Sequence, residues 1–133
     1  MLPLRYRENR ALVYVYRPSR LSQDLKCGSA RKILQDLGYE IGKPDRCVRN
    51  LMKRLKENAD FPHEIGLFLG YPPEDVQGFI EHHAAGYKCV GCWKVYGDAD
   101  AAQKQFEKYK KCTDIYCTLF AKGMSIERLT VAV

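Results

Sequence analysis

The sequence lacks any long apolar segment. Its longest apolar runs, such as Ala11–Tyr16, are far shorter than the roughly 20 residues that a membrane-spanning helix needs. The first residues, MLPLRYRENR, alternate apolar and charged side chains and have no continuous apolar core like that of a signal peptide. We therefore expect a protein that stays in the cytoplasm and has no membrane partner.

Several enzyme motifs are also absent. The chain has neither a GxxxxGK[ST] loop nor a GxGxxG fingerprint, the glycine-rich segments that hold phosphates. His63-Glu64 begins like the HExxH motif of zinc proteases, but Leu67 stands where the second histidine would be, which excludes that mechanism. We assign no catalytic residue and lean toward a non-enzymatic protein. His63 and Glu64 stay as acid–base candidates; alternatively, both are exposed in a first helical turn, where the helix dipole favours Glu64.

Cysteine is well represented, with six residues that should stay reduced in the cytoplasm. Four of them form the pattern C-x2-C-x19-C-x4-C: Cys89, Cys92, Cys112 and Cys117. Four thiolates can hold zinc tetrahedrally, so a zinc or iron site is one prediction. Against it, residues five apart on a helix lie about 140° apart around the axis, which separates Cys112 from Cys117. The alternatives are cysteines packed as small apolar side chains, or a redox pair at Cys89 and Cys92.

Positive charge is concentrated in the first part of the chain. Residues 1–60 carry 14 Lys and Arg against 7 Asp and Glu, whereas residues 61–133 carry 8 against 9. A helix predicted over 44–57 presents four basic residues opposite its apolar stripe: Arg46, Arg49, Lys53 and Lys56. This face predicts nucleic-acid binding as one alternative, and an ordinary solvated surface as the other. Glu74 and Asp75, at the start of a later helix, oppose a DNA-recognition helix there.

The chain pattern predicts an α+β fold in one domain, 1–133, with a small, mostly antiparallel sheet packed with several helices. The expected strands are a hairpin (2–7 and 11–17), a strand near 87–96 and a closing strand at 128–133. Helices are expected at 19–26, 30–37, 44–58, from 61 and 72 onward, and at 98–122, capped by Asp98. One stripe of the last helix holds Ala102, Phe106, Tyr109, Tyr116 and Phe120.

Aromatic residues suggest a further site. Trp93 has Tyr87 and Tyr96 nearby in the sequence, and together they could line a pocket for a planar ligand. The alternative is that these are amphipathic side chains on a sheet edge, some of them pointing outward. Both interpretations place Trp93 in or beside the predicted strand near 87–96.

Several segments resemble a bacterial family, associated with anaerobic Firmicutes, that carries only a domain-of-unknown-function label. They are ALVYVYRPSRL, FPHEIGLFLGYPPEDVQGFIE, GCWKVYGD, KYKKC and SIERLTVAV, and they cover nearly the whole chain. The resemblance supplies no catalytic residues. Members of the family are associated with genes for ferrous-iron uptake and flavodoxin, so the resemblance implies an accessory or binding role linked to iron or redox physiology, with a protein partner as one option.

The chain departs from this family in two ways. Similar proteins usually have more sequence before the tyrosine-rich hairpin, so the chain is either a short member or lacks an N-terminal segment. Similar proteins also do not always have cysteines at the positions of Cys92 and Cys117. That difference argues against a four-cysteine metal site shared by the family.

Overall fold

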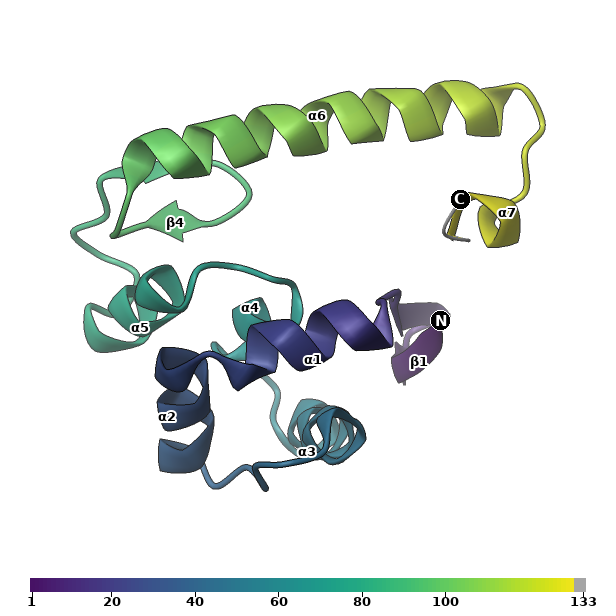
Figure 1. Cartoon of the computed structure of the whole chain (residues 1–133). Helices are drawn as coiled ribbons and strands as arrows, with labels where there is room; N and C mark the ends of the chain where they lie inside the picture. The colour runs from purple at the N-terminus through teal and green to yellow at the C-terminus, as the bar shows by residue number, and fades with distance from the viewer. Residues whose placement is uncertain (131–133) are drawn as a thin grey trace.

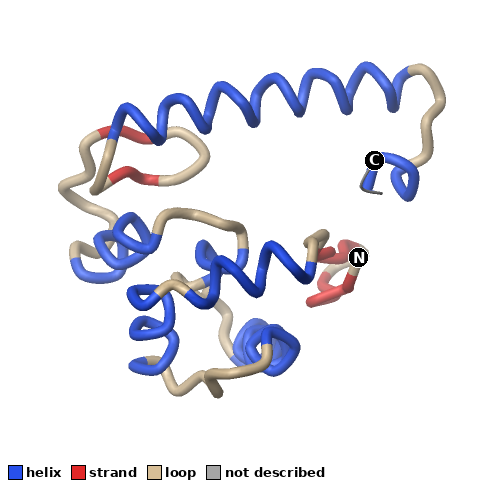
Figure 2. The backbone as a smooth tube through the Cα atoms, in the orientation of Figure 1, coloured by secondary structure: helices blue, strands red, loops and turns tan. Residues whose placement is uncertain are grey.

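The structure is a computed structural model that describes residues 1–130. In these residues, seven helices and two separate two-stranded antiparallel sheets form an α+β domain. Figure 1 shows most of the helices gathered into a body, with one long helix running across one side of it. Figure 2 shows the two small sheets at different places in the molecule. The predicted α+β class is therefore confirmed, although the strands do not join into one sheet.

The N-terminal hairpin forms as predicted. Strand β1 (Leu2–Arg7) pairs with β2 (Arg10–Tyr14), and the turn residues between them have positive φ angles. Tyr14 is buried and stacks on Tyr16, with ring centroids 4.5 Å apart, whereas Val13 is exposed. The alternation of side chains along β2 thus places Tyr14 toward the body, and Tyr16, just after the strand, packs on it.

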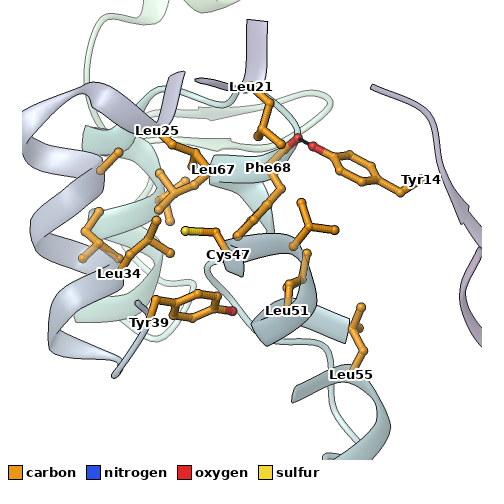
Figure 3. Close-up of a cluster of buried hydrophobic side chains, with 14 of the residues drawn as sticks. Tyr14, Leu21, Leu25, Leu34, Tyr39, Cys47, Leu51, Leu55, Leu67 and Phe68 are labelled. Atoms are coloured by element: carbon orange, nitrogen blue, oxygen red, sulfur yellow. Dashed lines mark hydrogen bonds between the residues drawn. The ribbon is translucent and has the colours of Figure 1, made fainter. Parts of the chain in front are cut away.

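Three helices supply most of the main core: α1 (Pro18–Lys26), α2 (Gly28–Asp36) and α3 (Pro44–Glu57). Proline begins α1 and α3, where its missing N–H costs no helical hydrogen bond. The apolar stripe of α3 points inward as predicted, and its buried members are Val48, Leu51 and Leu55. These side chains belong to one buried cluster with those of α1 and α2. Figure 3 shows Cys47 of α3 beside Leu25 and Leu34, and the Tyr14 hydroxyl donating a hydrogen bond to the Phe68 carbonyl.

Two shorter helices follow, α4 (Ile65–Phe68) and α5 (Pro73–Glu81), and then the second hairpin. The strand predicted over 87–96 is instead two short strands, β3 (Cys89–Val90) and β4 (Lys94–Val95), joined by a tight turn. The chain reverses over Gly91, Cys92 and Trp93, and the Gly91 N–H donates a hydrogen bond to the Trp93 carbonyl at 3.0 Å across the turn. This turn moves Cys92 out of any strand.

The long helix α6 (Ala99–Ala121) begins where predicted, because the Asp98 side chain accepts a hydrogen bond from the Ala101 N–H at 3.0 Å. The stripe predicted along it is covered only in its first half, since Tyr116 and Phe120 are exposed. No helix within residues 1–130 is both long enough and apolar enough to cross a bilayer.

The predicted closing strand at 128–133 is wrong over its described part. Residues 128–130 belong to helix α7 (Ile126–Thr130), and residues 131–133 lie outside the described residues. Ser125 precedes α7, and its hydroxyl accepts a hydrogen bond from the Arg128 N–H at 3.4 Å. Such a serine cap begins a helix, and it outweighs the β-branched character of this segment.

Candidate functional site

A pocket of about 370 Å³ lies between the segment before α4, helix α5 and the β3–β4 hairpin. Its walls are mostly aromatic and aliphatic side chains, which include Phe61, Tyr71, Phe79 and Trp93. His63 and Cys92 line the same pocket. The structure therefore places His63, from the predicted His-Glu pair, and Cys92, from the predicted cysteine site, around one cavity. Small-molecule sites are typically apolar pockets of this size with a few polar groups.

Trp93 forms a fixed wall of the pocket. Its side chain is buried, stacks on the Tyr71 ring at 4.6 Å, and meets the edge of the Phe106 ring from α6, also at 4.6 Å. Burial, with lesser effects from nearby Cys92 and Tyr109, raises the pKa of the Tyr71 phenol. Tyr71 thus stays neutral at physiological pH and presents an uncharged ring to Trp93. The position of the indole is therefore set by the protein before any ligand arrives.

The other two aromatic candidates lie elsewhere. The Tyr87 ring is exposed and sits under the Lys94 ammonium, 4.7 Å from it. Tyr96 stacks on His82 at 5.6 Å, and its hydroxyl donates to the Ala85 carbonyl. Both side chains hold the loop between α5 and β3 in place, while only Trp93 lines the pocket.

Asp75, on helix α5, is hydrogen-bonded to the β3–β4 hairpin and the residues that follow it. Its carboxylate is 3% exposed and accepts three hydrogen bonds, two of them from the backbone N–H groups of Tyr96 (2.9 Å) and Gly97 (2.8 Å). The third comes from the Trp93 indole N–H at 2.7 Å. Burying a carboxylate is costly unless hydrogen bonds replace its hydration, and here three donors do so. The sequence showed Asp75 only as an acid in a first helical turn.

His63 and Glu64 are neighbours that point in different directions. The His63 side chain is exposed at the rim of the pocket and packs on the Phe79 ring at 5.1 Å. Glu64 is 2% exposed and points into the body. The expectation that both are exposed is therefore wrong for Glu64, and the two side chains do not form a joint acid–base pair.

Glu64 belongs to a buried polar cluster. Its Oε1 accepts a hydrogen bond from the Tyr39 hydroxyl at 2.8 Å and forms an ion pair with Arg54, whose Nε lies 2.5 Å away. The Arg54 N–H is not aimed at that oxygen as a hydrogen bond requires, so we describe this contact as an ion pair only. Burial first, and the charge of Glu64 second, raise the pKa of Tyr39 far above its ordinary value. Sequence reasoning missed this cluster because its members are distant in the chain.

The four cysteines of the predicted metal site are divided among a strand, a turn and the long helix. Cys89 is half-buried in β3 and Cys92 is exposed in the turn, whereas Cys112 and Cys117 are exposed on α6. All are free thiols. Within residues 1–130, no three side chains of His, Cys, Asp or Glu come together in a way that could hold a metal ion.

The predicted nucleic-acid-binding residues lie on the exposed side of α3. Arg46 pairs with Glu40 at 3.2 Å and Lys53 pairs with Glu57 at 3.8 Å, while Arg49 and Lys56 are also exposed. Ion pairs on a surface are weak but reduce the positive charge available to phosphate groups. Nucleic-acid binding by this face stays a prediction.

A larger groove, of about 480 Å³, lies between the start of α1 and the first half of α6. Its lining is more polar and includes Arg20 and Asp24, which form an ion pair with each other at 3.4 Å. Asp75 and Trp93 line this groove as well as the pocket, but none of the predicted catalytic, metal-binding or nucleic-acid-binding residues does. The smaller apolar pocket is therefore the better candidate site.

Comparison with known protein families finds a match. A family model described as Protein of unknown function (DUF3793) matches residues 1–130. The chain belongs to this family. The expected membership of a family of unknown function is thus confirmed, and the apolar pocket lies wholly within the region that the DUF3793 family shares. No curated protein and no solved structure matches the chain.

Proposed function

We propose that this DUF3793 protein is a non-enzymatic binding protein whose pocket accepts a small, planar, largely apolar ligand. The observation that carries the proposal is the aromatic lining of the 370 Å³ pocket, with His63 and Cys92 in its wall. Aromatic rings stack on planar ligands, and each such contact contributes about 0.5–1.5 kcal/mol beyond the burial of apolar area. A histidine at the rim adds a hydrogen bond that can orient the ligand.

The surroundings of His63 favour binding over catalysis. A general acid or base is usually held by a second polar group that orients its ring. The ring of His63 instead packs on the apolar side chain of Phe79. Glu64, the nearest acid in the sequence, is engaged with Tyr39 and Arg54 inside the body.

A second candidate function is metal binding or thiol redox chemistry at the same pocket. The supporting observation is that His63 and Cys92, which are both metal-ligand types, line one cavity. This version retains the link to iron or redox physiology that the family resemblance implies. Zinc and iron measured per chain, in protein purified without chelator, test it. Metal that is lost in both His63→Ala and Cys92→Ser variants supports it, and wild-type protein free of both metals contradicts it.

Ligand binding can be tested with 2-naphthol as a planar probe of suitable size. A ligand of this size typically gains about 0.3–0.5 kcal/mol per heavy atom, so we expect a Kd of about 1 mM. The chain has a single tryptophan, so its indole N–H signal in an NMR spectrum is assigned without ambiguity. Trp93 lines both the apolar pocket and the larger groove, whereas Cys92 lines only the pocket, so a Cys92 variant distinguishes the two sites. We expect this signal to shift saturably as 2-naphthol is added.

The matched variants are Cys92→Phe and Cys27→Phe. The first places a ring in the pocket, whereas the second adds the same ring at an exposed position between α1 and α2. We expect Cys92→Phe to weaken 2-naphthol binding about tenfold, which corresponds to about 1.4 kcal/mol, and Cys27→Phe to bind as the wild type does. Equal binding by both variants, or no saturable shift in the wild type, would contradict the proposal.

A further inference from the structure

The second half of α6 presents an uncovered apolar face. Residues of this face recur at alternating spacings of four and three: Ala102, Phe106, Tyr109, Thr113, Tyr116 and Phe120. This heptad spacing is typical of a helix that packs along its length against another helix. In the first half, Phe106 and Tyr109 cover Trp93. In the second half, Tyr116 and Phe120 are 50% and 56% exposed.

Helix α6 cannot cover this face by folding back on the body. It runs without interruption over 23 residues, about 35 Å, and contains neither glycine nor proline. Sharp helix bends arise at proline, at glycine or at local bulges, so α6 is expected to stay straight. Figure 1 shows it as one long helix that starts beside β4 and runs across the molecule to the loop before α7. In a single copy of residues 1–130, the face from Thr113 to Phe120 is therefore open.

We propose that a second copy of this chain covers the face, with the two α6 helices packed antiparallel about a two-fold axis near Tyr116. Such an arrangement is self-complementary, as a two-fold interface must be. An antiparallel register centred on Tyr116 places Phe120 beside Cys112 of the second copy, and Leu119 beside Thr113 of the second copy. Large side chains then meet small ones in both pairs, which is how two helices interlock.

The area available matches a weak dimer. Half-exposed aromatic side chains such as Tyr116 and Phe120 each offer roughly 100 Å². With Thr113, the neighbouring Cys112 and Cys117, which are exposed, and the flanking lysine stems, the face offers roughly 600 Å² per copy. Two copies would bury about 1,200 Å², at the lower limit of specific interfaces. We therefore expect a dimer that dissociates in the micromolar concentration range rather than an obligate one.

The opposite side of α6 supplies the control. Lys111 and Asp114 are exposed and lie on the side away from Tyr116, as 100° per residue requires. Exchanging their charges, with Lys111→Glu and Asp114→Lys, leaves the net charge and the proposed interface unchanged. The test variant, Tyr116→Glu with Phe120→Lys, also leaves the net charge unchanged but places two charges in the interface. All four introduced residues are good helix formers.

Sedimentation velocity measured from about 1 µM to about 200 µM tests the proposal. For the wild type we expect the mean mass to rise with concentration from 15.3 kDa toward twice that value. The Tyr116/Phe120 variant should stay at the monomer mass at every concentration, with unchanged Trp93 fluorescence, and the Lys111/Asp114 variant should behave as the wild type. A wild type that stays monomeric throughout, a test variant that still dimerises, or a control that dissociates equally would overturn the proposal.

Discussion

Removing the Asp75 carboxylate should destabilise the protein more than any other change to an acid on α5. The side chain is 3% exposed and is the common acceptor for Trp93, Tyr96 and Gly97. A hydrogen bond to a charged group contributes about 1.5–3 kcal/mol, and donors left buried without partners add to the loss. Because water can reach part of the hairpin once it loosens, we expect Asp75→Ala to lower the free energy of unfolding by about 3–5 kcal/mol.

The milder variant Asp75→Asn tests the two carboxylate oxygens separately, because it replaces only one of them with a hydrogen-bond donor. The amide oxygen can still accept from the Tyr96 and Gly97 N–H groups, but the amide nitrogen then faces the Trp93 indole N–H, donor against donor. We expect a loss of about 2 kcal/mol. In a Trp93→Phe background that donor is absent, so the same Asp75→Asn change should cost at least about 1 kcal/mol less.

Urea unfolding followed by circular dichroism is the suitable assay, since two of the four proteins in this cycle lack tryptophan. Glu74→Gln is the control, because Glu74 shares the first turn of α5 and its dipole but is exposed. It should change the free energy of unfolding by no more than about 0.5–1 kcal/mol. If Asp75→Ala costs no more than Glu74→Gln, the three hydrogen bonds do not hold the hairpin and our account of the pocket wall fails.

Two further predictions concern packing and thiol reactivity. A Cβ added at Gly78 would come within 2.7 Å of the Tyr96 Cβ, whereas one at Gly28 would meet nothing within 4 Å. Thermal denaturation should show Gly78→Ala destabilised by about 1–3 kcal/mol and Gly28→Ala unchanged or slightly stabilised, and equal melting temperatures would contradict this. Burial raises the pKa of the Cys47 thiol, so in native protein at pH 8 Ellman's reagent should modify exposed Cys27 quickly and Cys47 only after unfolding. Mass spectrometry that finds Cys47 modified first would refute it.

The elements that the sequence predicted well are those with local signals. Helix α3 was predicted from the proline at its start and the apolar stripe along it, and other helices from a serine, aspartate or glycine at their ends. Each of these signals involves residues only a few positions apart in the sequence. The long helix α6 was bounded correctly because Asp98 begins it and Gly123, with a φ of 92°, follows its end. These features need no knowledge of the rest of the fold.

The errors arose where local signals competed. The segment 87–96 is rich in residues that favour strands, but Gly91 turns the chain in its middle and leaves two strands of two residues each. At the C-terminus the β-branched residues favoured a strand, and the Ser125 cap began a helix instead. Strand propensity describes how well a side chain suits a sheet surface, so it decides little where the structure places no neighbouring strand beside the segment.

The candidate pocket could be predicted only in part, because its geometry depends on contacts between distant residues. His63 and Cys92 were both identified as chemically capable, but their placement in one cavity follows from Asp75, which joins α5 to the hairpin across about 20 positions of sequence. Glu64 was identified beside His63, but its partners lie far from it in the sequence: Tyr39 in the loop after α2, and Arg54 on α3. A single sequence carries no record of such pairs.

The stripe on α6 shows most clearly what periodicity can and cannot establish. Leu51 on α3 and Tyr116 on α6 occupy equivalent positions in their own apolar stripes, yet Leu51 is fully buried and Tyr116 is half exposed. The spacing of apolar residues fixes which side of a helix avoids water, but whether another segment of the same chain reaches that side is decided by tertiary structure. Where none of the described residues does so, the stripe becomes a property of the surface. An exposed apolar face of this kind is the expected signature of an interface rather than of a core.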